Sequence, residues 1–378
     1  MKRLFALMLA LCLLLCACGG TPEETTPPAT DPTVTEAPTD APTEAPTDPP
    51  TEPPTEAPTD PTEAPTEPAP ELPYQNPITG ERLAEAWLAR PYAVAIDNDS
   101  KDATPHWGGG KADMIWELPH EGGSTRMVGV FCDVSDVDKL GPTRSVRPYV
   151  LSVAQCFNAI LVHAGGSPQG YDLLDETDWD NLDGVQGPGA GSYYKRDKDR
   201  LNKVDSWHTM YITGSNVLKY TKKLGYKTTF SETPNYNLTF TEDATPDGET
   251  AETIKVRFQK SGKKTNFYYD AAAGAYTAEQ FSAAYSDGND GAVPYFENVL
   301  ILKTSVSKLD DYGRLNVKMV GSGKGYFASG GKMVEINWSR DSANDSYTYT
   351  LADGTPLTLG IGKTYVAVIY KNGTVSAS

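Results

Sequence analysis

The sequence predicts an exported protein with an N-terminal α/β domain, in which helices cover a layered, mixed sheet, followed by a mainly antiparallel β domain. Three observations lead to this prediction. The chain begins with the pattern of a signal peptide, and a stretch rich in proline and threonine follows it. From about residue 74, strand patterns alternate with helix patterns, and beyond about residue 232 only short strand patterns remain. The chain from 74 to 378 is long enough for two domains of ordinary size.

Residues 1–17 have the form of a lipoprotein signal peptide. Two basic residues at 2–3 precede an apolar run at 4–15, which is shorter than the roughly 20 residues of a membrane span. Ala17 then precedes Cys18, as a small residue precedes the acylated cysteine of a lipobox. We therefore predict lipidation at Cys18, and the alternative is a plain secretory signal cleaved a few residues later. No later apolar stretch approaches membrane length, so we expect the rest of the chain on the extracellular face of the cytoplasmic membrane, anchored by lipid.

A disordered stalk is predicted for residues 18–73. Residues 21–70 repeat TEAP, TDAP and TDPP and contain almost no apolar side chain beyond alanine, so they cannot bury enough surface to offset the entropy of ordering. Proline-rich, uniformly negative chains stay extended, at about 3.1 Å per residue. The stalk has no Lys or Arg and holds most of the formal charge of −17. The mildly acidic remainder does not favour nucleic acid as a partner.

The N-terminal α/β domain is expected at 74–232. Its predicted strands lie at 92–96, 112–117, 127–131, 159–163 and 209–213, and its predicted helices at 146–157, from 167 onward and at 215–224. The first helix requires Pro148 to lie in its first turn, where the missing N–H costs nothing. Ser167 followed by Pro168 is typical of a helix cap and first helical position, and Gly225 is typical of a helix end.

The C-terminal β-rich domain is expected at 233–378. Its strand-like segments lie at 237–240, 254–258, 266–269, 299–302, 315–320, 325–328, 333–338, 347–351 and 365–370. Ser-Gly, Asp-Gly, Gly-Gly and Asn-Gly dipeptides separate several of them, as in antiparallel hairpins. We expect a small sandwich or a curled sheet.

Two cysteines remain beyond the signal and lipobox. Cys132 lies in VGVFCDV and Cys156 in VAQCFNAI, both apolar contexts. Two buried, reduced cysteines fit these contexts better than the disulfide that an exported protein could form. Neither has a basic neighbour that would lower its pKa, so neither is predicted to be a nucleophile.

Known catalytic and metal-binding motifs are missing from the sequence. The four histidines show no HxH or HExxH spacing, and the sequence has neither a GxSxG elbow nor a P-loop. We therefore predict no metal site and no cofactor.

Polar residues nevertheless collect at the ends of the predicted strands. In α/β sheets, ligands bind where strand ends meet loops, so these side chains predict a shared crevice. Loop and helix-start residues extend the set. The candidate ligand-binding residues are Asp97, Asn98, Glu117, Arg126, Arg144, Arg147, His163, Ser167 and His208.

Arg144 and Arg147 are the most suggestive of these candidates. At i and i+3 they would share a helical face and could hold a phosphate or a carboxylate. The backbone of Gly165 and Gly166 and the helix start at Ser167 would offer N–H groups to the same anion. The alternative is a buried structural network, in which one of the arginines pairs with Asp97 or Glu117.

Six motifs of the first domain resemble the YerB-like lipoprotein family of monoderm bacteria. They are PYAVAIDN, KADMIWE, EGGSTRMVGVF, GPTRSVRPY, ILVHAGGSPQGY and YYKRDKDR, in this order. GSGKGYFASGGKMVEINWSR and LADGTPLTLGIGKTYVAVI resemble the C-terminal domain of the same family, so the likeness spans nearly all of 76–370. This chain has Asp99 where the family often has histidine, and WHT around His208 where the family often has PHN. The family implies an uncharacterised N-terminal domain and no established reaction.

A second resemblance concerns the order of elements only. A strand ending in Asp, an Ala-Asp strand, a later arginine and a Gly-Gly helix start are similar to the LytR-CpsA-Psr phosphotransferases, although their arginine signatures are not present. Two functions stay open. The first is a surface lipoprotein that binds a cell-wall polymer or an envelope protein. The second is an envelope-polymer hydrolase or phosphotransferase, with Arg144 and Arg147 stabilising anionic charge, Asp97 or Glu117 as base, and His163 as acid or base.

Overall fold

The computed structural model describes residues 72–378, which belong to one compact unit. The predicted signal peptide, Cys18 and nearly all of the predicted stalk lie outside the described residues. Within them, no helix is long and apolar enough to cross a membrane. The described residues form mostly sheet, with few helices.

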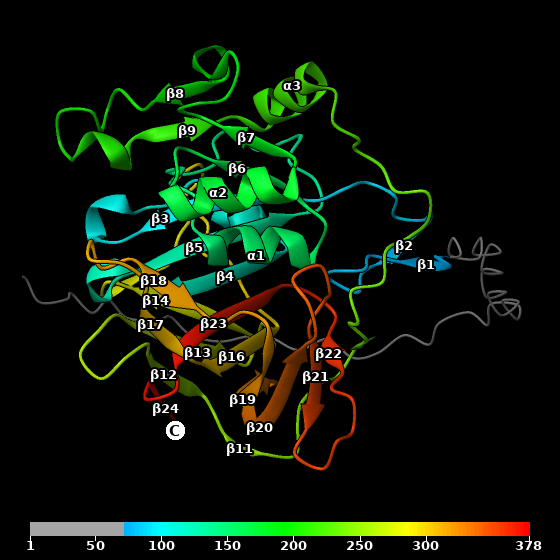
Figure 1. Cartoon of the computed structure of the whole chain (residues 1–378). Coiled ribbons are helices and arrows are strands. Elements are labelled where there is room, and N and C mark those ends of the chain that lie inside the picture. The colour runs from blue at the N-terminus through cyan, green and yellow to red at the C-terminus, as the bar shows by residue number, and fades with distance from the viewer. Residues whose placement is uncertain (1–71) are drawn as a thin grey trace, which may run out of the picture. The chain divides into compact units, whose positions relative to one another are not determined.

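A central sheet of 11 strands runs through the described unit (Figure 1). In spatial order its strands are β11 (Glu249–Thr250), β20 (Lys332–Arg340), β19 (Gly321–Ser329), β16 (Asn298–Thr304), β23 (Thr364–Tyr370), β4 (Met114–Pro119), β5 (Thr125–Phe131), β3 (Tyr92–Asn98), β6 (Ile160–His163) and β7 (Asn181–Asp183), with β21 (Thr348–Leu351) paired to β20. The sheet is mixed, since β3 runs antiparallel to β5 and parallel to β6. Among its C-terminal strands, β19 runs antiparallel to both of its neighbours, β16 and β20.

The parallel pair β23–β4 joins the two halves of the sequence in this sheet. Tyr365 lies opposite Ile115 and Ala367 lies opposite Glu117. Strands β3, β4 and β5 are buried along their whole length, which explains their nearly continuous apolar sequence.

Two helices lie over one face of the sheet, α1 (Pro148–Cys156) and α2 (Pro168–Thr177) (Figure 1). Apolar residues of α1 form one core cluster with residues of this face, among them Trp116, Leu300 and Val366. Helix α3 (Gly214–Leu224) and an antiparallel sheet cover the other face, where Ile115 and Ile301 share a cluster with Val256 of the smaller sheet. The smaller sheet has the order β15 (Ala283–Ala284), β14 (Ala275–Gln280), β13 (Lys264–Asp270), β12 (Thr253–Arg257) and β24 (Thr374–Ala377).

Short elements complete the fold. Four two-stranded pairs are β1–β2 (Tyr74–Gln75, Arg82–Leu83), β8–β9 (Tyr194–Arg196, Met210–Ile212), β10–β22 (Phe240–Thr241, Leu359–Gly360) and β17–β18 (Val306–Lys308, Leu315–Val317). The 3₁₀ turns are η1 (Lys101–Ala103), η2 (Gly109–Lys111), η3 (Glu121–Gly123), η4 (Ala190–Ser192) and η5 (Ser206–His208).

Several local predictions are confirmed. The Ser167 hydroxyl caps α2 by accepting a hydrogen bond of 3.0 Å from the Gly170 N–H, and Pro168 is the first helical residue. Gly225 ends α3 in the left-handed region, at φ 74°. Cys132 and Cys156 are free and buried, and burial raises the pKa of both thiols. The prediction of two buried cysteines without a disulfide is therefore confirmed.

The expected start of the first helix is wrong. The helix begins at Pro148, because the residue before a proline is held in extended conformation. Arg147 accordingly has φ −128° and ψ 158°. Arg144 and Arg147 therefore precede the helix and do not share a helical face.

The prediction of a separate β region was only partly correct. The antiparallel sheet β15–β14–β13–β12–β24 has the expected character, but β16, β19, β20 and β23 extend the sheet of the first region. The boundary at 232/233 stays a prediction.

Candidate functional site

Side-chain alternation along β3 divides the predicted crevice residues between the two faces of the sheet. Successive residues of a strand point to opposite faces. Asp97 lies beside Arg126 in the register, and Asn98 lies beside Thr125. Asn98 accordingly reaches Glu117 and the smaller sheet, whereas Asp97 reaches the loops before α1 and β9. The sheet itself separates the two groups.

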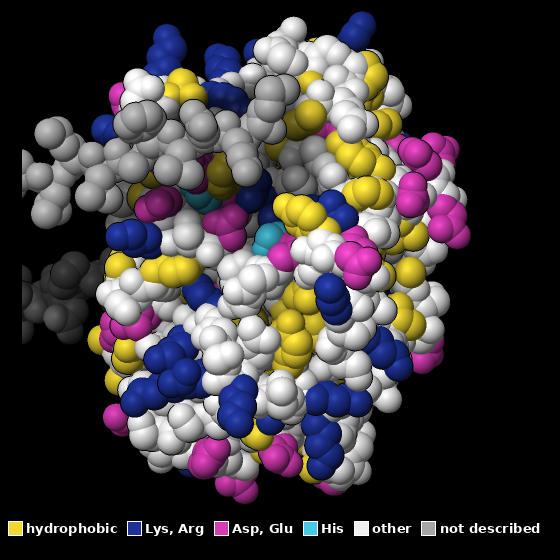
Figure 2. All heavy atoms as spheres, turned by 60° about the vertical axis from the view of Figure 1, so that its left-hand side comes forward, with side chains coloured by type: hydrophobic (Ala, Val, Ile, Leu, Met, Phe, Trp, Pro, Cys, Tyr) yellow, Lys and Arg dark blue, Asp and Glu magenta, His cyan; other side chains and the backbone are white. Residues whose placement is uncertain are grey.

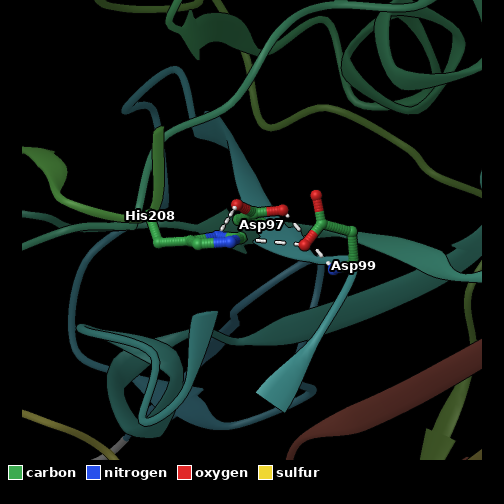
Figure 3. A group of neighbouring side chains, drawn as sticks. All are labelled: Asp97, Asp99 and His208. Atoms are coloured by element: carbon green, nitrogen blue, oxygen red, sulfur yellow. Dashed lines mark hydrogen bonds and ion pairs between the residues drawn. The ribbon is translucent and has the colours of Figure 1, made fainter. Parts of the chain in front are cut away.

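Asp97, Asp99, Arg144 and His208 form a polar cluster at the end of β3, here called the Asp97 cluster. A hydrogen bond of 2.7 Å joins His208 Nδ1 and Asp97 Oδ2, and Arg144 Nε lies 3.0 Å from the same oxygen. Arg144 Nη2 lies 2.9 Å from Asp99 Oδ2. Figure 3 shows His208 and the two carboxylates turned toward one another. The structure thus brings together three of the predicted residues.

The charges in this cluster stabilise one another. Burial alone would raise the pKa of Asp97, but the His208 hydrogen bond and the charge of Arg144 outweigh it and lower the pKa to about 2. For His208, burial alone would lower the pKa, and the hydrogen bond to Asp97 raises it above its ordinary value. Asp97 is therefore an ionised acceptor that holds both the imidazole and the guanidinium in place.

Asp97, Asp99 and His208 could together offer ligands to a cation. One possible ligand atom of each lies within 4.8 Å of the others. Arg144 already gives positive charge to both carboxylates, so a cation would have to displace its guanidinium. The arrangement is fully explained by the arginine, and the predicted absence of a metal stays a prediction.

A pocket of about 340 Å³ opens beside Arg144. Its wall carries two guanidinium groups, two aromatic rings and glycine backbone; the residues are Thr143, Arg144, Ser145, Ala164, Gly165, Gly166, Tyr171, Val185, Gln186, Arg196, Trp207 and Met210. Trp207 is 47% exposed, which is unusual for so large an apolar side chain. Figure 2 shows a hollow on one face of the molecule in which histidine, acidic and basic side chains lie next to one another.

Arg196 reaches this pocket through the pairing of β8 with β9, in which it lies opposite Met210. Its Nη1 donates to the backbone oxygen of Ser206 and, at 3.3 Å, to the Thr209 hydroxyl. Among the described residues no carboxylate forms an ion pair with it. Its charge is therefore free to meet an anionic ligand.

His163 supports the same pocket from behind, whereas Ser167 serves as the cap of α2. The fully buried His163 ring is hydrogen-bonded to Gly165 O at 2.8 Å and to Asn181 Oδ1 at 3.0 Å. Asp183 accepts from the Gly165 N–H and from the Tyr171 hydroxyl, each at 2.8 Å. These bonds fix the glycine turn and the tyrosine, so His163 positions the wall of the pocket.

Glu117 and Asn98 belong to a buried network at the junction of the two halves of the sequence. The Glu117 carboxylate accepts hydrogen bonds from Asn98 at 3.0 Å and Thr125 at 2.7 Å, and from Thr265 at 2.8 Å and Tyr365 at 2.6 Å. Lys263 Nζ lies 3.4 Å from it. Burial alone would raise the pKa of Glu117, but the charge of Lys263 and these hydrogen bonds lower it. Because its donors come from both halves of the sequence, the Glu117 carboxylate links the first half to the second.

Arg126 and Arg147 lie on the α1 side of the sheet. Arg147 Nε pairs with Glu121 Oε1 at 2.8 Å, and the His120 ring lies beside the same Glu121 carboxylate. The expected structural pair is thus found for Arg144, with Asp97, whereas Arg147 pairs with Glu121, which the sequence analysis did not name. Arg126 is 1% exposed, and its Nη1 donates to Ser145 O at 2.8 Å.

Sequence reasoning missed Asp99, Tyr171, Arg196 and Trp207. Tyr171 and Arg196 lie in motifs that the sequence analysis quoted, but only the fold brings them to one pocket. Asp99 follows Asp97 by two residues, and residues two apart in a strand point to the same side of the sheet, so the sequence did offer a reason to place the two carboxylates together.

The comparisons with known proteins agree on one family. Residues 78–227 match the N-terminal domain, and residues 254–366 the C-terminal domain, of a protein family of unknown function, DUF3048. YerB, a candidate lipoprotein of Bacillus subtilis (strain 168), is 26% identical over 296 residues, which are 78% of this chain and 85% of YerB. The chain belongs to the YerB-like DUF3048 family. The crystal structure of Bacillus subtilis YerB matches with a TM-score of 0.69 and 24% identity, over 80% of this chain and 99% of that one.

Membership of the YerB-like family confirms the resemblance of the motifs and supports a lipoprotein of unknown molecular function. The relative suggests anchoring to a membrane by lipid.

Proposed function

We propose that this YerB-like protein is a lipid-anchored protein of the outer cell surface that binds an anionic segment of an envelope polymer. The ligand lies in the pocket between Arg144, Arg196, Tyr171 and Trp207. One observation carries the proposal. The guanidinium of Arg196 lines a pocket that also holds the exposed Trp207, and none of the described carboxylates forms an ion pair with it.

The chemistry of the pocket favours a ligand that is both anionic and partly apolar. A guanidinium holds phosphate or carboxylate through two parallel hydrogen bonds. The rings of Trp207 and Tyr171 offer flat apolar surface with a polar edge. A volume of about 340 Å³ is near the lower end of ligand pockets, which span about 300–1,000 Å³. One or two units of a polymer, such as a phosphate and the sugar next to it, fit this description.

The Arg144 guanidinium gives the pocket a fixed geometry. It is held by Asp97 and Asp99, so it is ordered before a ligand arrives. A binding group that is already ordered loses less entropy on binding. Arg196 then supplies a positive charge that no described carboxylate engages, whereas Arg144 is paired with Asp97 and Asp99.

Calorimetric titration of the full chain in detergent with purified anionic wall polymer tests this proposal. Arg196→Met is expected to weaken binding at least tenfold. The matched control is Lys195→Met on the neighbouring residue of β8, which is exposed and does not line the pocket. Equal loss in both variants indicates general charge attraction, and unchanged binding in Arg196→Met excludes this pocket.

A second candidate function, hydrolysis or transfer of the polymer, is favoured by the pair Asp97–His208. A carboxylate bonded to Nδ1 of a histidine orients the ring so that Nε2 can act as a base. His208 Nε2 has no hydrogen-bonding partner among the described residues. Turnover of the polymer that is lost in His208→Gln, while binding persists, supports the enzyme. Binding without product in the wild type supports the first function.

A further inference from the structure

We propose that the side chains of Lys263 and Gln280 become joined by an isopeptide bond, and that Glu117 is the acid–base group for its formation. The three side chains meet in the buried network around Glu117, where each contacts the other two. The bond does not depend on the polymer pocket, which is lined by other residues.

The first observation is a buried amine in contact with a buried amide. The side chain of Lys263 is 5% exposed, Gln280 is 2% exposed, and Lys263 Nζ donates a hydrogen bond to Gln280 Oε1. Gln280 lies opposite Thr265 in the pairing of β13 with β14, and Lys263 comes two residues before Thr265. Strand pairing therefore holds the amine beside the amide. Two groups held together in this way react far faster than the same groups free in solution.

The second observation is the position of the Glu117 carboxylate. Its Oε1 lies 3.4 Å from Lys263 Nζ, and its Oε2 accepts a hydrogen bond of 3.2 Å from Gln280 Nε2. One carboxylate thus contacts both the nitrogen that would attack and the nitrogen that would leave. A group in this position can accept a proton from the first nitrogen and return a proton to the second.

Asn98 completes the arrangement from β3. Its Nδ2 donates to Gln280 Oε1 at 3.3 Å. This oxygen gains negative charge when the amine attacks, and a donor already aimed at it stabilises that charge. The ring of Phe281 lies 4.2 Å from Lys263 Nζ and helps to exclude water, which would otherwise compete with the amine for the amide.

The amine must lose its proton before it can attack. Burial lowers the pKa of Lys263 below its ordinary value, although the charge of Glu117 opposes this effect. Lysine in a desolvated site is a known type of nucleophile. Glu117 is ionised, because Lys263 and the surrounding hydrogen bonds lower its pKa, so it starts as a carboxylate that can take up a proton.

The reaction balances without a further reactant. The bond between Lys263 Nζ and Gln280 Cδ forms, and Glu117 takes a proton from Nζ. The bond between Cδ and Nε2 of Gln280 then breaks, Glu117 returns the proton to Nε2, and ammonia leaves. An amine and a primary amide thus become a secondary amide and ammonia. The Lys263–Glu117 ion pair is the arrangement before this reaction.

The bond would tie β13 to β14 covalently next to the strand β4 that carries Glu117. Cys132 and Cys156 are free, so the described part of the chain has no disulfide that could do the same. A covalent link of this kind restricts the unfolded chain in the way that a disulfide does, and reducing agents do not break it.

Tryptic digestion and mass spectrometry of the full chain, purified in detergent, test the bond. Without it, 265–303 is released as a linear peptide, because this stretch has no internal Lys or Arg. With it, trypsin cannot cleave after Lys263, and 261–264 stays attached to 265–303. We expect most of 265–303 in this branched form, lighter by one ammonia than the sum of its parts. Linear 265–303 with an intact Gln280 as the main product would overturn the proposal.

Three variants assign the roles. Glu117→Gln removes the acid–base group and Gln280→Met removes the reacting amide, so each should abolish the branched peptide. Gln280→Met keeps both members of the Lys263–Glu117 ion pair, which separates the covalent bond from the electrostatic one. The matched control is Lys264→Arg, on the exposed neighbour, which keeps the trypsin site and should keep the branched peptide. A branched peptide that persists in Gln280→Met contradicts the assignment.

The wild-type digest decides the question alone if Glu117→Gln does not fold. A link from Lys263 to Glu117 with loss of water, or hydrolysis of Gln280 without any link, would each overturn the proposed bond. Loss of the ion pair also changes stability, so the covalent link is the readout and the melting temperature is not.

Discussion

Replacing Glu117 by glutamine should destabilise the protein by roughly 3–5 kcal/mol, the usual cost of removing one member of a buried ion pair. Glutamine keeps the shape of the side chain but loses the charge. The side chain of Lys263 is 5% exposed and that of Glu117 is fully buried, so the ammonium group of Lys263 would keep its hydrogen bond to Gln280 but lose its counter-charge. Glutamine keeps only one acceptor oxygen, so either the donors to Oε1 or Thr265 and Tyr365, which donate to Oε2, would lose their acceptor.

Urea unfolding of the wild type, Glu117→Gln, Lys263→Met and the double variant measures this cost. The double variant should recover much of the stability, because it contains no unpaired buried charge. The pKa of Glu117 is lowered in the folded state, so its contribution is present above its unfolded pKa and is lost as the pH falls through the folded value. A loss below about 1 kcal/mol in Glu117→Gln, or a double variant no better than the single ones, would refute the reasoning.

Three further outcomes are expected. Folding lowers the pKa of Asp97 from 3.8 to about 2, so its stabilising effect is full above about pH 4 and declines toward pH 2. In a measurement of the free energy of unfolding against pH, Asp97→Asn should therefore flatten the curve in this range. Arg147→Ala should lower the melting temperature by several degrees, because it leaves the half-buried Glu121, which lies beside His120, without its arginine. An unchanged melting temperature would show that the Arg147–Glu121 pair does not stabilise the fold. Globomycin should block processing at Cys18, and unaffected processing would exclude the predicted lipidation.

Local features of the fold could be predicted from the sequence because their causes are local. Ser167 and Pro168 determine the start of α2 by hydrogen bonding and by a fixed φ, whatever surrounds them. Pro148 acts in the same local way. Its effect on Arg147 could have been predicted, but the spacing of the two arginines was interpreted as helical.

The long-range features could not be predicted in this way. The pairing of β23 with β4 joins strands far apart in the sequence, and nothing in either strand specifies its partner. The same holds for Arg196, which reaches the pocket only because β8 pairs with β9. The separation of Asp97 from Asn98 is different, since strand alternation alone predicts it.

The central claim is that the pocket at Arg196 and Trp207 holds an anionic polymer segment. A crystal structure of the protein with a short, phosphate-bearing fragment of the wall polymer tests it most directly. We predict fragment density in this pocket, with the phosphate bonded to the Arg196 guanidinium and the sugar against Trp207. Fragment density elsewhere on the protein, with this pocket filled only by water, would contradict the claim.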